Sequence, residues 1–171
     1  MAPRALGISL HTGWGACVVA GGSPAAPEIV ANEIIEILGD SERFCFHIAA
    51  EMKAAEAERW IARARDKAVA NAARALAPLV ARASICALVA KGGSAGTLEA
   101  ILASHPRIHT AEGCFYRDAV REACTIPVRL VPPRALDPSK VGKLAPPPWG
   151  KDQKLAVLAA WSVLAEARSA G

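Results

Sequence analysis

Residues 5–20 have the sequence ALGISLHTGWGACVVA, and this stretch decides how the fold begins. The run from Ala5 to Leu10 is short and apolar, as is typical of a strand. Thr12-Gly13-Trp14-Gly15 has the composition of a turn, and residues 16–20 resume an apolar run containing Cys-Val-Val. Two strand-like runs joined by a short glycine-containing turn predict a β-hairpin.

The following segments extend this hairpin and then change period. Residues 21–24 predict a second turn, and the β-branched run from Ile29 to Leu38 predicts a third strand. From about Ala50 to Leu79 the apolar residues recur at helical spacing, which predicts a long helix. Pro78 predicts a kink or an end in its last turn.

The second half of the chain alternates strands and helices. Its predicted elements are a buried strand at 84–90, a helical region at 97–124 interrupted near Pro106, a strand at 127–131, an irregular proline-rich connection at 132–148 and a helix at 152–167. The order β-β-β-α-β-α-β-α predicts an α/β fold, a mixed sheet with helices on both faces. We expect a single domain over residues 1–171, because we find no internal repeat and no low-complexity tract.

Composition limits the classes of function. The 20 basic and 16 acidic residues give a net charge of +4, which permits an anionic partner but is less basic than a dedicated nucleic-acid-binding face. No apolar run is long enough to cross a bilayer, and the first residues lack the apolar core of a signal peptide. The odd number of cysteines and the absence of CxxC spacing favour reduced cysteines in a cytoplasmic protein.

Two segments resemble a known superfamily. Leu6-Gly7-Ile8-Ser9 with Trp14-Gly15 resembles the first hairpin of RuvC-type Holliday-junction resolvases, which have an RNase H-like fold. The segment from Asp152 to Trp161 resembles their last helix. Further phrases resemble an uncharacterised bacterial protein family; they are residues 11–14, 104–113 and 148–154. The resemblance implies an RNase H-like mixed sheet, a three-strand meander followed by parallel strands.

The chemistry that the resemblance implies does not carry over intact. The resolvases use carboxylates on the first strand, at the end of the fourth strand and on the last helix to hold two divalent metals. The matching positions here are Ser9, the Ala90-Lys91 end of the fourth strand, and Asp152. One carboxylate cannot hold a pair of Mg²⁺ ions, so we do not expect ordinary RuvC-type cleavage.

The segment from Ser104 to Gly113 contains the strongest remaining candidates. On a helix, His105, His109 and Glu112 fall at i, i+4 and i+7 and share one face. Imidazoles and a carboxylate in this arrangement can bind a transition metal such as Zn²⁺ or Mn²⁺. Alternatively, one imidazole acts as a general acid or base with Glu112 orienting it. A third interpretation is a hydrogen-bonded network inside the core, which Pro106 favours by disturbing the helix at His105.

Other candidates lie in loops and at element ends. His11 follows the first strand, and Asp152 and Lys154 begin the last helix; we predict catalytic roles for these three. Arg117 could neutralise an anionic substrate, and Trp14 and Trp149, both beside glycines, could stack on a base or sugar. Two weaker features are a possible contact between His47 and Glu51 and the glycine-rich loop that begins at Lys91; Lys91 is followed by the sequence GGSAGT.

Three functions fit these features. The first is an enzyme acting on a phosphoester of a nucleic acid or nucleotide through a His/carboxylate site. The second is a catalytically inactive nucleic-acid-binding or assembly protein, and the third is a metal-dependent hydrolase of a small molecule. The candidate cofactor is a divalent metal (Zn²⁺, Mn²⁺ or Mg²⁺). The candidate partners are nucleic acid, another phosphate-containing ligand and a second copy of the chain, with no membrane partner expected.

Overall fold

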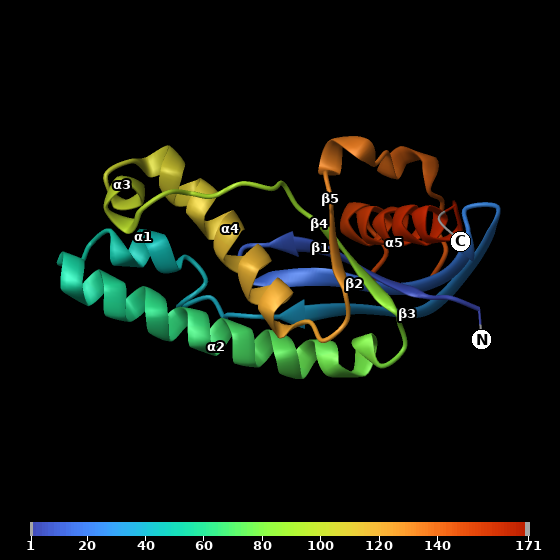
Figure 1. The fold of residues 1–171 in the computed structure, drawn as a ribbon, viewed down its shortest axis with the longest axis horizontal. Helices are drawn as coiled ribbons and strands as arrows, with labels where there is room; N and C mark the ends of the chain where they lie inside the picture. Colours follow the sequence, from blue (N-terminus) through green and yellow to red (C-terminus); the bar gives the residue numbers. More distant parts are fainter. Residues whose placement is uncertain (1, 170–171) are drawn as a thin grey trace.

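A computed structural model describes residues 2–169, and a five-stranded mixed sheet forms its centre (Figure 1). Met1 and residues 170–171, which the predicted domain includes, lie outside the described residues. The strand order is β3-β2-β1-β4-β5. Neighbours pair antiparallel among the first three strands and parallel from β1 to β4 and from β4 to β5. The strands are β1 (Ala5–His11), β2 (Trp14–Ser23), β3 (Ala26–Glu36), β4 (Ile85–Val89) and β5 (Val128–Val131).

Five α-helices lie among residues 2–169, and the predicted mixed α/β architecture is confirmed. They are α1 (Cys45–Ala49), α2 (Ala54–Val80), α3 (Leu98–Leu102), α4 (His105–Ala123) and α5 (Lys151–Ser169). The short helix α1 was not predicted. The predicted break near Pro106 is present, and Pro106 itself lies in the first turn of α4, where its missing N–H removes no helical hydrogen bond. Pro78 stays inside α2, close to the end of the helix.

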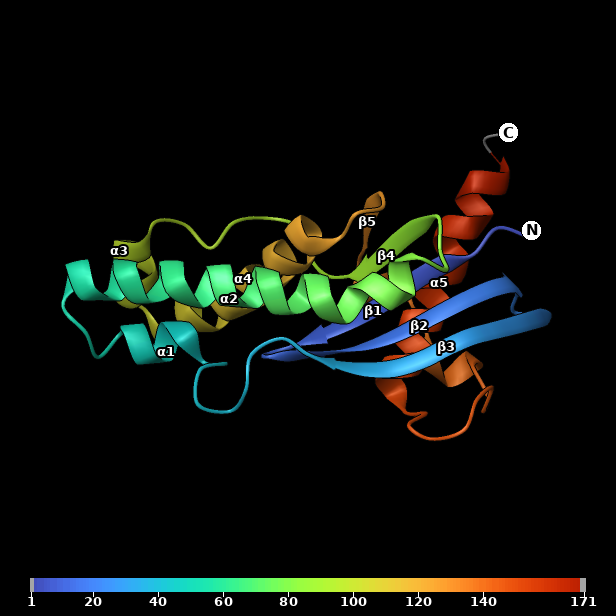
Figure 2. The same cartoon turned by 90° about the horizontal axis from the view of Figure 1, so that it is seen from below.

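The period-2 alternation of the strands divides the core between two sheet faces. Leu6 and Ile8 of β1 belong to an apolar cluster that includes residues of α1, α2 and α4. Ala5 belongs to a second cluster, which includes α5 and Val141 of the proline-rich connection. Figure 2 shows α2 and α5 on opposite faces of the sheet. Adjacent residues of one strand therefore pack against different layers.

Gly7 sets the distance between β1 and α5. A Cβ atom on Gly7 would lie 1.8 Å from the backbone oxygen of Ala156, so only glycine permits this approach. Ser9 lies two residues beyond Gly7 on β1, and Asp152 lies about one turn before Ala156 on α5. Both steps span about 6 Å. The same close packing therefore brings Asp152 over Ser9, and their side chains are hydrogen-bonded.

Within residues 2–169, no helix has both the length and the apolar character that a membrane crossing requires.

Candidate functional site

The candidate site begins where two parallel strands end together. β1 and β4 are hydrogen-bonded neighbours, with Ser9 beside Val89, so their carboxyl ends meet at one edge of the sheet. His11 is the last residue of β1, and Ala90 and Lys91 directly follow β4. In open α/β sheets this edge is where ligands commonly bind.

His11 and Asp152 form a close pair at this edge. His11 Nε2 lies 2.8 Å from Asp152 Oδ1, and the Ser9 hydroxyl donates to the same oxygen at 3.1 Å. The side chains of His11 and Asp152 are 45% and 26% exposed, so the pair is open to solvent. A proton held between Nε2 and the carboxylate leaves Nδ1 of His11 as the nitrogen that can accept another proton.

Trp14 fixes the plane of the His11 ring. The two residues face each other across the hairpin, and their rings stack with centres 4.3 Å apart and planes 5° apart. The tryptophan ring therefore supports the His11 ring directly, and the stacking of Trp14 on a ligand stays a prediction.

A groove of about 600 Å³ runs from the strand ends to α4. Two cations, Lys91 and Arg117, and two imidazoles, His11 and His109, are among its lining residues, and no carboxylate of the described part of the chain is. The remaining lining residues are Leu10, Thr12, Val89, Ala90, Gly92, Thr110, Gly113, Cys114 and Tyr116. A groove with this lining favours an anionic ligand.

Arg117 contributes less free charge than its position suggests. Its side chain is 8% exposed; Nε and Nη2 donate to the carboxylate of Asp118, and Nη1 donates to the Lys91 backbone oxygen at 3.0 Å. The hydrogen bond with Asp118 raises the pKa of Arg117 above its ordinary value. Arg117 therefore anchors Lys91 at the groove, and Lys91 is the more available cation.

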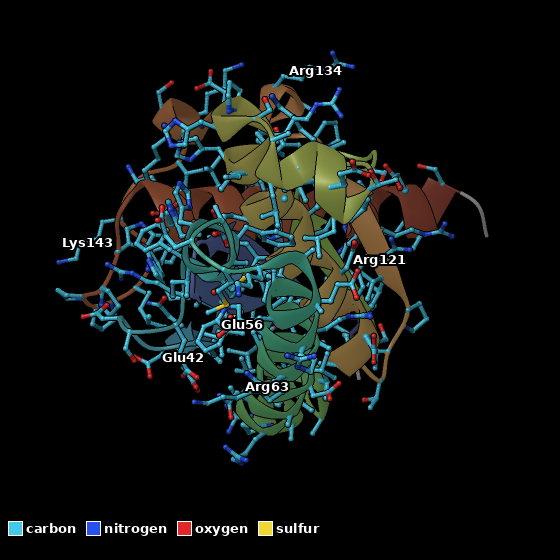
Figure 3. The ribbon with its side chains drawn as sticks, turned by 90° about the vertical axis from the view of Figure 1, so that its left-hand side faces the viewer. Glu42, Glu56, Arg63, Arg121, Arg134 and Lys143 are labelled. Atoms are coloured by element: carbon cyan, nitrogen blue, oxygen red, sulfur yellow. The ribbon has the colours of Figure 1, made fainter. Side chains whose placement is uncertain are left out.

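A smaller hollow of about 280 Å³ continues the basic surface. It shares Lys91 and Gly92 with the groove and adds Arg134, Pro132 and Pro133. In Figure 3, Arg134 lies on the opposite side of the molecule from Arg63 of α2. The two arginines therefore provide one variant beside the groove and one far from it.

Three histidines converge near the other end of the groove. Atoms of His47, His105 and His109 that could bind a metal all lie within 4.8 Å of one another. His47 comes from α1, and His105 and His109 come from successive turns of α4; Figure 1 shows these helices at the same end of the molecule. His105 and His109 are exposed, and His109 also lines the groove.

Glu112 lies behind the histidines and is 3% exposed at its side chain. Its Oε1 accepts from the backbone N–H of Phe46 at 2.9 Å and lies 3.2 Å from His47 Nδ1, while Oε2 accepts from the Cys45 thiol at 3.4 Å. The carboxylate therefore caps the first turn of α1 and orients His47. Burial, followed by the charge of Glu112, raises the pKa of Cys45, which keeps this thiol protonated.

The predicted site residues fall into two groups and a remainder. His11 and Asp152 meet, as do His105 and His109, and Arg117 lines the groove. Glu112 is not one of the three converging residues. The third is His47, in the role that we predicted for Glu112. Lys154 and Trp149 do not line the groove; the Trp149 indole donates to the Gly142 oxygen and packs against the second apolar cluster.

We expected His47 to contact a different residue, Glu51. The hydrogen-bond partner of its ring is Glu112, which is 65 residues away in the chain. Nothing local to residues 45–49 indicates this contact, because it depends on how α1 packs against α4. The contact between Ser9 and Asp152 was also missed, although the resemblance aligned both residues with metal-binding positions.

The fold is similar to two solved structures of RuvC from Thermus thermophilus. One is a RuvC structure, and the other is RuvC in complex with a Holliday junction substrate. Each has a TM-score of 0.51 and 15% sequence identity, and the match covers 98% of this chain and 96% of the RuvC chain. No protein-family model matches the sequence, and no curated protein matches it. The chain therefore has a distant RuvC-like, RNase H-like fold.

The residues at the strand edge do not fit a pair of divalent metals. β1 presents Ser9, β4 leads into Ala90 and Lys91, and the one carboxylate, Asp152, already binds Ser9 and His11 through Oδ1. A cluster of magnesium ions requires several carboxylate oxygens. The edge instead offers an imidazole–carboxylate pair, whose chemistry is proton transfer.

Proposed function

We propose that the protein hydrolyses a phosphoester of a nucleic acid or nucleotide bound in the groove. The observation that carries the proposal is the His11–Asp152 pair, which opens into a groove lined by cations and imidazoles without a carboxylate. The RuvC-like fold supports a phosphoester substrate, since one of the similar RuvC structures contains a Holliday junction substrate.

In this proposal His11 is the general base and Asp152 is its positioning residue. Asp152 holds the proton on Nε2, and Nδ1 removes a proton from water as the water oxygen bonds to phosphorus. The bond from phosphorus to the leaving oxygen breaks, that oxygen takes a proton from solvent, and His11 later releases its own proton. Lys91 neutralises the phosphate, whose negative charge would otherwise repel the attacking oxygen.

The test is hydrolysis of bis(p-nitrophenyl) phosphate and of labelled single-stranded, duplex and branched DNA. We expect His11→Ala and Asp152→Asn to lower the rate by about 100-fold or more, the range typical of a lost general base. Because both side chains are partly exposed, the melting temperature should barely change. Unchanged rates in both variants would contradict the assignment of His11 and Asp152.

A second function, nucleic-acid binding without hydrolysis, is favoured by the missing metal-binding carboxylates at Ser9 and Ala90. It predicts DNA binding that weakens steeply with salt, with no product from any of the substrates above. Lys91→Ala and Arg134→Ala should each weaken binding, whereas Arg63→Ala, on the far side of the molecule, should not. A protein that neither binds nor cleaves these substrates would exclude both functions.

A further inference from the structure

We infer that His47, His105 and His109 form a binding site for a single zinc ion. The inference concerns residues of α1 and α4, and it is separate from the His11–Asp152 pair in which the proposed hydrolysis occurs. Only the catalytic use of the ion would rest on the proposed function.

The spacing of the three rings fits one shared ion. Their centres lie 4.6 Å apart for His105 and His109, 4.9 Å for His47 and His109, and 5.5 Å for His47 and His105. Imidazoles bound to one zinc ion at about 2.1 Å have ring centres about 5 Å apart. The ring spacing therefore suits one shared ion, and the ligand nitrogens, which lie within 4.8 Å of one another, must draw closer to bind it.

Glu112 prepares His47 for metal binding. Its Oε1 lies 3.2 Å from Nδ1, so the ring donates through Nδ1 and presents the lone pair of Nε2. A carboxylate behind a metal-binding histidine is the usual second layer of a zinc site, where it fixes the ring and increases its basicity. Among residues 2–169, Glu112 forms an ion pair with His47 alone. A bound cation would therefore also compensate this buried charge.

The ligand set selects the metal. Three neutral imidazoles suit Zn²⁺ and similar transition metals, whereas Mg²⁺ and Ca²⁺ require oxygen ligands. Three protein ligands leave a fourth position for water, which is the arrangement of catalytic zinc sites. Because His109 also lines the groove, the ion would lie beside the groove.

The experiment uses untagged protein, stripped with a chelator and dialysed against buffered Zn²⁺, with zinc measured by mass spectrometry. We expect one zinc ion per chain, and occupancy at background in His105→Ala and His109→Ala. Both side chains are exposed, so these variants should keep the melting temperature of the metal-free protein. Glu112→Gln should weaken binding by about 10- to 100-fold, as expected for loss of a positioning carboxylate.

His11→Ala is the matched control, because it removes a groove histidine that is outside the group of three. It should bind zinc as the parent protein does. Substitution of cobalt adds a spectroscopic test: a tetrahedral visible spectrum without a thiolate charge-transfer band is expected. Background zinc in the parent protein, full occupancy in the His105→Ala, His109→Ala double variant, or a thiolate band would overturn the inference.

The two proposals fail separately. Zinc binding without phosphoester hydrolysis would support the metal site and contradict the hydrolase. Hydrolysis that depends on His11 in a protein that binds no zinc would support the hydrolase and overturn the metal site.

Discussion

Two imidazole–carboxylate pairs near the groove, one at its sheet end and one behind its helix end, differ in how far they are exposed to solvent. At the sheet end, the imidazole of His11 meets the carboxylate of Asp152, and both side chains are partly exposed. At the helix end, the imidazole of His47 meets the carboxylate of Glu112, which is 3% exposed and also binds backbone N–H groups. One carboxylate is open to solvent, and the other is part of the packed core.

Burial decides what each carboxylate can do. Solvent reaches Asp152 and His11, and in the proposed reaction Asp152 holds the proton on Nε2 of His11. Glu112 cannot be removed without leaving the Phe46 N–H and the His47 ring without a partner, so its first contribution is to structure. Under the two proposals, the sheet end supplies the reacting pair, and the helix end supplies the support for His47, His105 and His109.

The largest loss of stability is expected when the close contact between β1 and α5 at the sheet end is disturbed. In Gly7→Ala, the new methyl group would meet the Ala156 backbone oxygen, and α5 must move away from β1. We expect a loss of unfolding free energy of about 3 kcal/mol. Chemical denaturation measures this loss, and the displaced Asp152 should also lose its contact with His11.

Gly113→Ala is the control for that variant. Gly113 lies within α4, and a Cβ atom there has no neighbour within 4 Å. Alanine should therefore raise stability by about 0.5–1 kcal/mol, because it reduces the entropy lost on helix formation. Equal stability of Gly7→Ala and the parent protein would show that α5 does not depend on this close contact.

Removing the buried carboxylate should have the next largest effect. Glu112→Ala leaves the first turn of α1 without its cap, and we expect a loss of about 2 kcal/mol by chemical denaturation. Glu112→Gln keeps an acceptor oxygen and should lose less. The control is Glu122→Ala on the same helix, because Glu122 is 53% exposed in its pair with Arg65 and should change stability by under about 1 kcal/mol. A loss in Glu112→Ala no larger than in this control would contradict the role given to Glu112.

The contacts of Gly7 and Glu112 mark the limit of what could be predicted from the sequence. The strands and long helices follow from local period and turn composition, and the three-strand meander with later parallel strands was predicted correctly. The i, i+4 spacing also placed His105 and His109 on one helix face. These predictions depend on residues that are close together in the chain.

The parts that could not be predicted depend on how the helices pack. His47 joins His105 and His109 because α1 lies against α4, and Glu112 turns toward α1 because the α1 backbone donors need a partner there. The close contact of Gly7 with Ala156, which lets β1 and α5 approach each other, also depends on packing between distant parts of the chain. A periodic sequence pattern predicts which face of a helix is buried but not which residues it meets.

A smaller effect on stability is expected at the sheet end. Asp152→Asn keeps the shape of the side chain and an acceptor for Ser9, and the pair with His11 is partly exposed. We expect a loss of under about 1 kcal/mol, as for other solvent-exposed ion pairs. Thermal and chemical unfolding of this variant should therefore match the parent protein closely. A loss as large as that of Glu112→Ala would remove the contrast between the two ends.

The smallest expected effect is on the alkylation rate of Cys124, which lies at the C-terminal end of α4, away from both histidine groups. The pKa of Cys124 is lowered to about 7, first because the Cys86 thiol donates a hydrogen bond to its sulfur. Its thiolate fraction, and therefore its alkylation rate, should rise between pH 6 and pH 8 with a midpoint near 7.

Iodoacetamide labelling followed by peptide mass spectrometry measures this rate. Cys86→Ala removes the donor and should move the midpoint upward, and a midpoint near the ordinary thiol value in the parent protein would refute the pairing. Because Cys114 lines the groove and Cys124 does not, a groove ligand should slow labelling of Cys114 alone, which makes the Cys124 rate the internal reference for occupancy of the groove.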